Sequence, residues 1–281
     1  MKKTVSLIIA AVMILAAFAL TGCSSGKAKS LDDIKKSGKL VVYTEAGFAP
    51  YEFIYNNEIV GVDVEIMKAV AKKIGVECEI SNVLFDSICA SVKSGKANVG
   101  AAGITITDDR KKTVDFSDAY SSTEQYVIVA EDNSEIKSAE DLKGKKIGVQ
   151  QGTTSDISVN KLITDKFIEG ASVITYDSPA LAAASLPNKV DAVVTDKLTA
   201  ELIVKSNSGL KTFKLADKDG KDVCEVEYYG IAVSKGSDEL LAVINETIKE
   251  LTDNGSIANW IDYYSSLVDS DNSGETSGNA Q

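Results

Sequence analysis

The chain has 281 residues, 44% of them hydrophobic, which suits two globular units of about 150 residues each with packed cores. Its formal net charge of −11 comes without any basic tract, which argues against a nucleic-acid partner. Histidine is absent, which excludes Ser-His-Asp and Cys-His catalysis and the commonest metal ligand, so we expect no catalytic residue, metal or cofactor.

The amino terminus has the pattern of a secretory signal. Met1-Lys2-Lys3 precedes an apolar or small stretch from Val5 to Leu20. A membrane-spanning helix needs about 20 apolar residues, whereas this stretch runs into Thr21-Gly22-Cys23 and a polar segment. The Leu-x-Gly-Cys end resembles the lipobox of bacterial lipoproteins, which implies a lipid on Cys23. We therefore expect a signal peptide over 1–22, a lipid-anchored tether over 23–36 and a location on the extracytoplasmic face of the cell membrane. Removing Lys2 and Lys3 takes the charge from −11 to −13.

The first half of the chain alternates between predicted strands and helices. An apolar strand over 40–43 ends in a Gly/Pro loop over 44–50. Val62, Ile66, Ala69, Val70 and Ile74 recur at helical spacing before Gly75, with Asp63, Glu65, Lys68 and Lys72 off that stripe. A strand over 76–80, a helix over 85–93 and a strand over 97–101 follow. This alternation favours a mainly parallel α/β sheet covered on both faces.

The second half repeats this plan between two β-like runs, 124–130 and 229–234. Between them lie a helical turn at 138–141 and alternating strands and helices over 145–195. Predicted helices over 239–251 and 257–264 end the folded part. If both β runs cross between units, residues 37–127 and 231–268 form lobe 1, residues 128–230 form lobe 2, and the cleft lies between them. The segment 269–281 is rich in Asp, Asn, Ser and Gly and is predicted to be disordered.

The three cysteines after Cys23 show no C-x-x-C spacing. Cys78, Cys89 and Cys224 each lie in a strand-like or helix-like run. They are predicted to be buried free thiols, with a Cys78–Cys89 bridge as the alternative.

Three segments combine polar groups with the ends of predicted strands, where open α/β folds bind ligands. Gly103 and Thr105 precede Arg110, whose guanidinium offers a bidentate fork to a carboxylate. Gln151-Gly152-Thr153-Thr154 begins a helix and forms an anion site, without the lysine and glycines of a nucleotide-binding P-loop. Asp196 ends a buried strand and offers a carboxylate to an ammonium group. Each segment has a simpler interpretation as a helix cap. Together they suggest a zwitterionic ligand held by both lobes.

The order of several motifs is similar to that of the family 3 bacterial extracellular solute-binding proteins. The resemblance covers residues 35–265 and rests on Phe48-Ala49-Pro50-Tyr51-Glu52, Gly61-Val62-Asp63-Val64-Glu65-Ile66, Gly103 to Arg110 with Val114-Asp115-Phe116-Ser117, Gly144 to Val149, Gln151 to Thr154, and Tyr229-Gly230-Ile231-Ala232-Val233. Val62 replaces a larger residue, and Ala102 stands where a serine is common.

The resemblance implies a type II periplasmic-binding-protein fold that closes by hinge motion in 124–130 and 229–234. It places the ligand α-carboxylate on Arg110, aided by Thr153 and Thr154, and the ammonium on Asp196 alongside Gly103 and Thr105. Phe48 and Phe85 then flank the ligand side chain. The implied partners are a free L-amino acid and the permease and ATPase subunits of an ABC importer, and we expect a monomer. A cyclohexadienyl dehydratase-like enzyme and a ligand sensor are the alternatives on the same fold.

The acidic residue Glu45 bears on the ligand side chain. The resemblance places its loop in the side-chain pocket, where a buried carboxylate needs a donor or cation and aromatic faces favour a cationic stem. We therefore expect arginine, lysine, histidine or glutamine ahead of leucine or glutamate. The alternative is that Glu45 points to solvent and the aromatic rings only pack.

Overall fold

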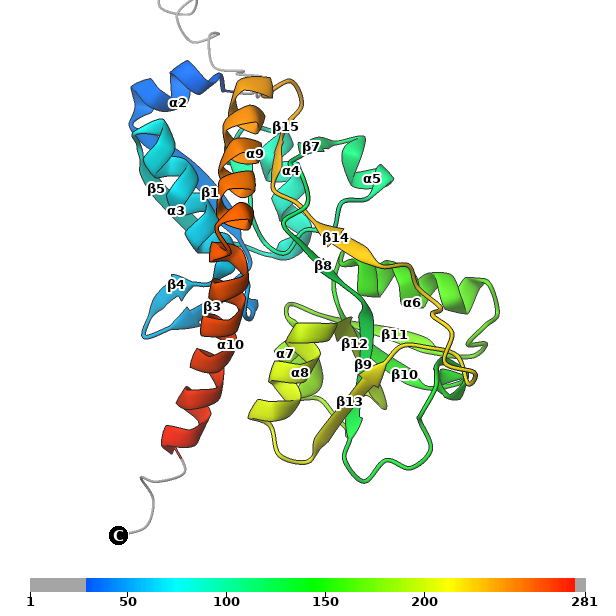
Figure 1. Cartoon of the computed structure of the whole chain (residues 1–281). Coiled ribbons are helices and arrows are strands. Elements are labelled where there is room, and N and C mark those ends of the chain that lie inside the picture. The colour runs from blue at the N-terminus through cyan, green and yellow to red at the C-terminus, as the bar shows by residue number, and fades with distance from the viewer. Residues whose placement is uncertain (1–28, 276–281) are drawn as a thin grey trace, which may run out of the picture.

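A computed structural model describes residues 29–275, so the predicted signal peptide and Cys23 lie outside the described residues. Two α/β lobes are joined by two adjacent crossing strands (Figure 1). This arrangement confirms the predicted fold class. Within 29–275, no helix combines the length and the apolar content that a bilayer span requires.

Lobe 1 is built on a five-stranded sheet in the order β5-β1-β6-β15-β7. The strands are β1 Lys39–Thr44, β5 Glu77–Asn82, β6 Val99–Gly100, β7 Val114–Phe116 and β15 Ala232–Ser234. Strand β1 is parallel to β5 and β6, whereas β15 is antiparallel to β6 and β7. The helices of this lobe are α2 Leu31–Ser37, α3 Val62–Ile74, α4 Ile88–Lys93 after a 3-10 turn at Phe85–Ser87, α5 Asp108–Lys111, α9 Asp238–Asp253 and α10 Ser256–Glu275.

Helix α3 has the predicted bounds because its signals agree with one another. The apolar stripe of Val62, Ile66 and Val70 is buried, and Gly75 ends the helix in the left-handed conformation. Asp63, which falls off that stripe, is nevertheless buried at 1% exposure. A carboxyl in such a place needs internal partners.

The ends of the folded part differ from the prediction. Helix α2 begins after Ser30, which forms a capping box with Asp33, so the last part of the predicted tether is helical. At the other end, α10 continues past Val268 to Glu275. The prediction of disorder from 269 is therefore wrong as far as 275, because a formed helix adds one backbone hydrogen bond per residue and no proline interrupts it.

A small three-stranded sheet occupies much of the stretch between the first strand and α3. It consists of β2 Gly47–Phe48, β3 Glu52–Tyr55 and β4 Glu58–Val60 in that order. Strands of two to four residues are too short for an alternation pattern to reveal. This sheet carries Phe48 and Glu52.

Lobe 2 contains a second five-stranded sheet in the order β11-β10-β12-β9-β13. Its strands are β9 Gln125–Ala130, β10 Lys146–Gln150, β11 Ser172–Tyr176, β12 Ala192–Asp196 and β13 Leu210–Lys214. Its helices are α6 Thr154–Thr164, α7 Pro179–Ala183 and α8 Lys197–Ser206, with a 3-10 turn at Ala139–Leu142. Strands β10, β11 and β12 are parallel, and β9 is antiparallel to both of its neighbours.

The crossing strands are β8 Ser121–Thr123 and β14 Glu227–Tyr229, which pair antiparallel between the lobes (Figure 1). The segment 125–130 instead forms β9 of lobe 2, and 232–234 forms β15 of lobe 1. The first crossing therefore lies just before the predicted segment 124–130, and the second begins before the predicted segment 229–234 and overlaps it at Tyr229. The β-like composition continues through each crossing into a sheet, so it does not mark where a strand changes partners.

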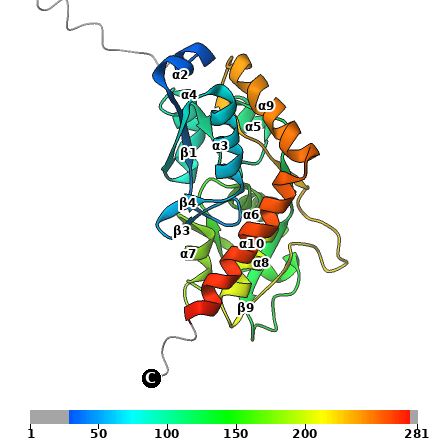
Figure 2. The same cartoon turned by 60° about the vertical axis from the view of Figure 1, so that its left-hand side comes forward.

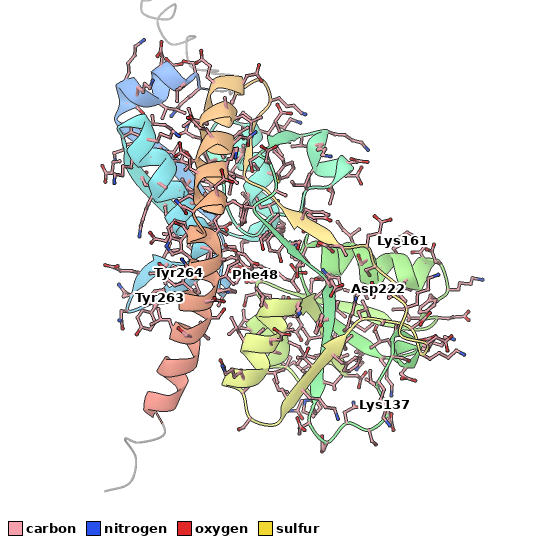
Figure 3. The ribbon with its side chains drawn as sticks, viewed as in Figure 1. Phe48, Lys137, Lys161, Asp222, Tyr263 and Tyr264 are labelled. Atoms are coloured by element: carbon pink, nitrogen blue, oxygen red, sulfur yellow. The ribbon has the colours of Figure 1, made fainter. Side chains whose placement is uncertain are left out.

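Helix α10 runs along lobe 1 and reaches α8 of lobe 2 (Figures 1 and 2). Tyr264 on α10 packs edge-on against Phe53 of β3, with ring centroids 6.0 Å apart, and donates to Glu65. Figure 3 shows Tyr263 and Tyr264 on α10 at the level of the small sheet. Leu198 of α8 packs against the core of lobe 1, to which Trp260 of α10 also packs.

The three described cysteines are half-buried and free. The alternative of a Cys78–Cys89 bridge is therefore wrong. Cys78 packs against the lobe 1 core, Cys224 against the lobe 2 core, and Cys89 against a smaller cluster around α4.

Candidate ligand site between the lobes

A cavity lies between the lobes and is lined by residues of both. All the binding residues proposed from the sequence except Gln151 line it. Four further residues line it that sequence reasoning did not select for binding. The complete lining is Glu45, Phe48, Phe85, Ala102, Gly103, Thr105, Arg110, Gln150, Thr153, Thr154, Ser155, Thr195 and Asp196.

Gln150, not Gln151, faces the cavity. Gln150 ends β10 at 4% exposure and donates from Nε2 to Glu45 Oε2 and to the Asp177 carbonyl, both at 2.8 Å. Gln151 is exposed and donates to Asp86 Oδ2 at 2.8 Å outside the cavity. Gln150 is the last residue of β10, whereas Gln151 follows the strand and does not line this cavity.

Arg110 reaches across the cleft from lobe 1. Its Nη1 donates to the Thr105 carbonyl at 2.8 Å, and its Nη2 donates to the Gly152 carbonyl of lobe 2 at 3.1 Å. The guanidinium carbon also lies 5.3 Å from the centre of the Phe85 ring. Burial lowers the pKa of Arg110. Both acceptors are neutral carbonyls and a guanidinium carries five N–H donors, so this half-buried cation is well placed to bind an anion.

The helix-cap interpretation of the Arg110 segment is correct for its neighbour. Thr107 Oγ1 accepts from the Arg110 backbone N–H at 3.2 Å and caps α5. The cap holds the backbone of Arg110 while leaving its side chain directed to the cleft. Capping and ligand contact are therefore compatible here.

Asp196 ends β12 at 7% exposure and accepts hydrogen bonds from Gln125 Nε2 and the Tyr229 hydroxyl. It stands at the N-cap position of α8, but its side chain makes no cap hydrogen bond. The simpler cap interpretation is therefore wrong for this residue. Burial, followed by the nearby Glu227, raises the pKa of Asp196 to about 7. An ammonium group beside it would favour the ionised form.

Glu227, on the crossing strand β14, connects residues of both lobes behind the cavity. Its Oε2 accepts from Thr105 Oγ1 at 2.7 Å and from Thr154 Oγ1 at 2.5 Å, and its Oε1 accepts from Gln125 Nε2 at 3.0 Å. Sequence reasoning missed Glu227 because an alternating strand normally buries its apolar residues and exposes its polar ones. Here the apolar neighbours Val226 and Tyr228 are exposed and Glu227 is buried.

The first turn of α6 supplies Thr153 and Thr154. Thr153 Oγ1 accepts from the Asp156 N–H at 3.3 Å, which confirms the cap interpretation for that residue. The preceding Gly152 has φ +76°, and a Cβ on it would lie 2.8 Å from the Asp86 Cβ of lobe 1. A glycine is therefore required where lobe 1 meets the helix end.

Glu45 lies inside the cavity, which contradicts the alternative that it points to solvent. It is 9% exposed and accepts from Gln150. Burial raises its pKa to about 7, with a smaller contribution from Asp177. Phe48 is buried beside it, and Figure 3 shows Phe48 where the small sheet meets lobe 2. Glu45 and Asp196 together outnumber the single cation Arg110 in the lining.

The lobes are closed on one another. Hydrogen bonds cross the cleft from Gln150 to Glu45, from Arg110 to the Gly152 carbonyl, from Gln151 to Asp86, and from Thr199 to the Ala49 carbonyl, and the Thr105 and Thr154 hydroxyls are 3.3 Å apart. Opening would separate the residues of lobe 1 from those of lobe 2.

Comparison with known proteins places this geometry in a family. Residues 40–266 match the family described as bacterial extracellular solute-binding proteins, family 3. The chain is 35% identical over 257 residues to the arginine-binding extracellular protein ArtP of Bacillus subtilis, covering 92% of this chain and 95% of that protein. It is 32% identical over 231 residues to the L-cystine-binding protein TcyJ of Escherichia coli, covering 81% and 82%.

A solved structure shows the same fold. The amino acid ABC transporter substrate-binding protein AbpA from Streptococcus pneumoniae, bound to L-arginine, superposes with a TM-score of 0.76 at 31% identity, covering 84% of this chain and 98% of that one. These relatives are named as binding proteins, not as enzymes. The chain belongs to family 3 of the bacterial extracellular solute-binding proteins.

Proposed function

We propose that this protein captures a free cationic amino acid, with arginine as the preferred ligand, for an ABC importer. The observation that carries the proposal is the buried carboxyl of Glu45. It lies in the same cavity as the cation Arg110 and the acidic group of Asp196. Arg110 and Asp196 suit the two charges of any amino acid. Glu45 adds a second acidic group, which already accepts from Gln150 Nε2, and a cationic ligand side chain would compensate its charge.

The charges of the lining suggest one orientation for the ligand. Its α-carboxylate binds the remaining donors of Arg110, and its ammonium binds Asp196. Its guanidinium then reaches Glu45, with the stem near the faces of Phe48 and Phe85. Because the groups come from both lobes, ligand binding stabilises the closed arrangement. The protein changes no covalent bond of its ligand.

Delivery requires partners outside this chain. We assign it a permease and an ATPase of an ABC importer, as the names of similar proteins support. The Leu-x-Gly-Cys sequence supports a lipid on Cys23 that holds the protein at the extracytoplasmic face of the cell membrane.

Calorimetric titration with arginine, lysine, histidine, glutamine, cystine, leucine and glutamate tests the ligand. We expect arginine to bind most tightly. Tightest binding of leucine or glutamate would contradict the role of Glu45, and tightest binding of cystine would redirect the proposal to a neutral amino acid.

Glu45→Gln is expected to weaken arginine binding by about 10- to 100-fold, because a hydrogen bond to a charged partner contributes about 1.5–3 kcal/mol. Glutamine binding should change much less, since an amide can pair with either side chain. Glu131→Gln, which removes an exposed glutamate of lobe 2, is the matched control. Equal losses for arginine and glutamine would show that Glu45 does not read the ligand side chain.

The affinity for arginine is expected to fall as the pH falls below about 7. Glu45 and Asp196 have pKa values raised to about 7, and protonation competes with the cationic groups of the ligand. Each carboxyl that must lose a proton on binding changes the affinity by up to about tenfold per pH unit. The slope should therefore be steeper for arginine, which contacts both carboxyls, than for glutamine. Calorimetry across this pH range measures both slopes, and identical slopes would exclude contact of the guanidinium with Glu45.

A further inference from the structure

Two buried carboxyls, Glu52 and Asp63, lie behind the ligand cavity without lining it. Glu52 on β3 is 0% exposed, and Asp63 on α3 is 1% exposed. Asp63 Oδ2 accepts from the Gly103 N–H at 3.0 Å and from the Tyr120 hydroxyl at 2.8 Å. Within the described chain, both oxygens of Glu52 and the remaining oxygen of Asp63 find no N–H or O–H donor.

One proton resolves this shortage of donors. Two ionised carboxylates offer only acceptors, whereas a protonated carboxyl is also a donor. Burial, followed by the charge of the neighbouring Asp63, raises the pKa of Glu52 well above its ordinary value. Asp63, which accepts from Gly103 and Tyr120, is the partner better suited to carry the charge.

The pair is connected to the ligand site through Gly103. This glycine lines the cavity and has φ +53°, and a Cβ on it would lie 2.8 Å from Phe48 Cε1 and 3.8 Å from Glu52 Oε1. Its N–H points inward to Asp63. A charged acceptor on the N–H fixes the orientation of this part of the cavity wall, and it places one negative charge behind the wall.

We propose that Glu52 donates its carboxyl proton to Asp63, and that this acid–carboxylate pair is the positioning element that holds Gly103 in its ligand-binding conformation. The inference rests on the proposed function, because Gly103 matters to binding only if the cavity holds an amino acid. Neither carboxyl touches the ligand. The titratable groups that interact electrostatically with Glu52 are Asp63, Glu45, Tyr51 and Tyr120. All four are acidic, so none of them supplies a positive charge that would favour the ionised form of Glu52.

Comparing Glu52→Gln with Glu52→Met distinguishes the loss of the hydrogen-bond donor from the replacement of the side chain by another of similar length. The amide of glutamine can still donate to Asp63, so we expect arginine affinity within about threefold of the wild type. Methionine has similar length but no donor, and leaving Asp63 without it should weaken arginine binding by at least about tenfold. Glu58→Gln on the neighbouring strand β4, where the glutamate is exposed, is the reference for removing a glutamate. Calorimetry measures all four proteins, and wild-type affinity in Glu52→Met would overturn the positioning role.

The pH dependence of stability tests the proton itself. The native protein retains a proton on Glu52 that the unfolded chain releases above its ordinary pKa of 4.5, so raising the pH favours unfolding. Relative to Glu52→Gln, the unfolding equilibrium constant of the wild type should rise with pH above about pH 5, by up to about tenfold per unit. Urea titration of the unliganded proteins measures this ratio.

A ratio that does not change with pH would overturn the protonated state of Glu52, even if Glu52→Met did not fold. A wild type that binds no amino acid would contradict the proposed function instead, and the pH comparison would still decide whether Glu52 holds a proton.

Discussion

Arg110→Ala is expected to abolish most of the affinity for every amino acid ligand. Arg110 is half-buried, its guanidinium donates to the carbonyls of Thr105 and Gly152, and in our proposal it receives the α-carboxylate common to all such ligands. Breaking a buried charge pair costs about 3–5 kcal/mol, which corresponds to about two to three and a half decades of affinity. Calorimetry with arginine and glutamine should show similar losses for both.

Two further variants make the Arg110 experiment specific. Lys111→Ala removes an exposed cation of the same short helix and should bind as the wild type does. Arg110→Lys keeps the charge but loses the planar fork, so its affinity should lie between those of Arg110→Ala and the wild type. Arg110→Ala that folds and binds arginine normally would remove Arg110 from the site.

Asp196→Asn should weaken ligand binding by about two decades or more while leaving the unliganded protein at least as stable at pH 8. The loss of affinity follows from removing the partner of the ammonium, a buried ion pair. The stability follows from the raised pKa of Asp196. Above the ordinary pKa of 3.8 the unfolded chain ionises this group freely, so the buried carboxyl destabilises the fold as the pH rises.

Opposite effects on binding and on stability distinguish Asp196 from a residue that only supports the fold. Thermal melting without ligand and calorimetry with ligand measure the two quantities. Glu201→Gln on the exposed face of α8 is the control. A variant that lost affinity and stability together would point to a structural role for Asp196.

The sequence predicted elements where several local signals agreed. Helix α3 has an apolar stripe and a terminal glycine, and its bounds were correct. Strands of the small sheet are too short to show an alternation, and the crossings at β8 and β14 lie inside longer β-like runs. Where a strand exchanges one partner for another depends on contacts between distant segments, which local composition does not encode.

The same distinction applies to the site. Arg110 and Asp196 stand at strand and helix ends, where local rules suggest binding, and both line the cavity. Glu227 and Gln125 reach the site from the crossing and from the strand after it. Asp63 appeared to be one of several charged residues on a helix surface, and only the packing of β3 and the Gly103 loop against α3 reveals its burial. Polar groups that support a site from behind are recognised by their partners, which are remote in sequence.

The contact between α10 and α8 means that the strength of binding and the choice of ligand are set by different residues. Leu198 of α8 lies two residues after the cavity-lining Asp196, but it does not line the cavity and packs instead against the core of lobe 1, so this contact stabilises the closed population before any ligand enters. Apparent affinity scales with the fraction of molecules that are already competent to bind. A change in this contact would therefore multiply the dissociation constants of all ligands by one common factor, and their ranking would stay the same.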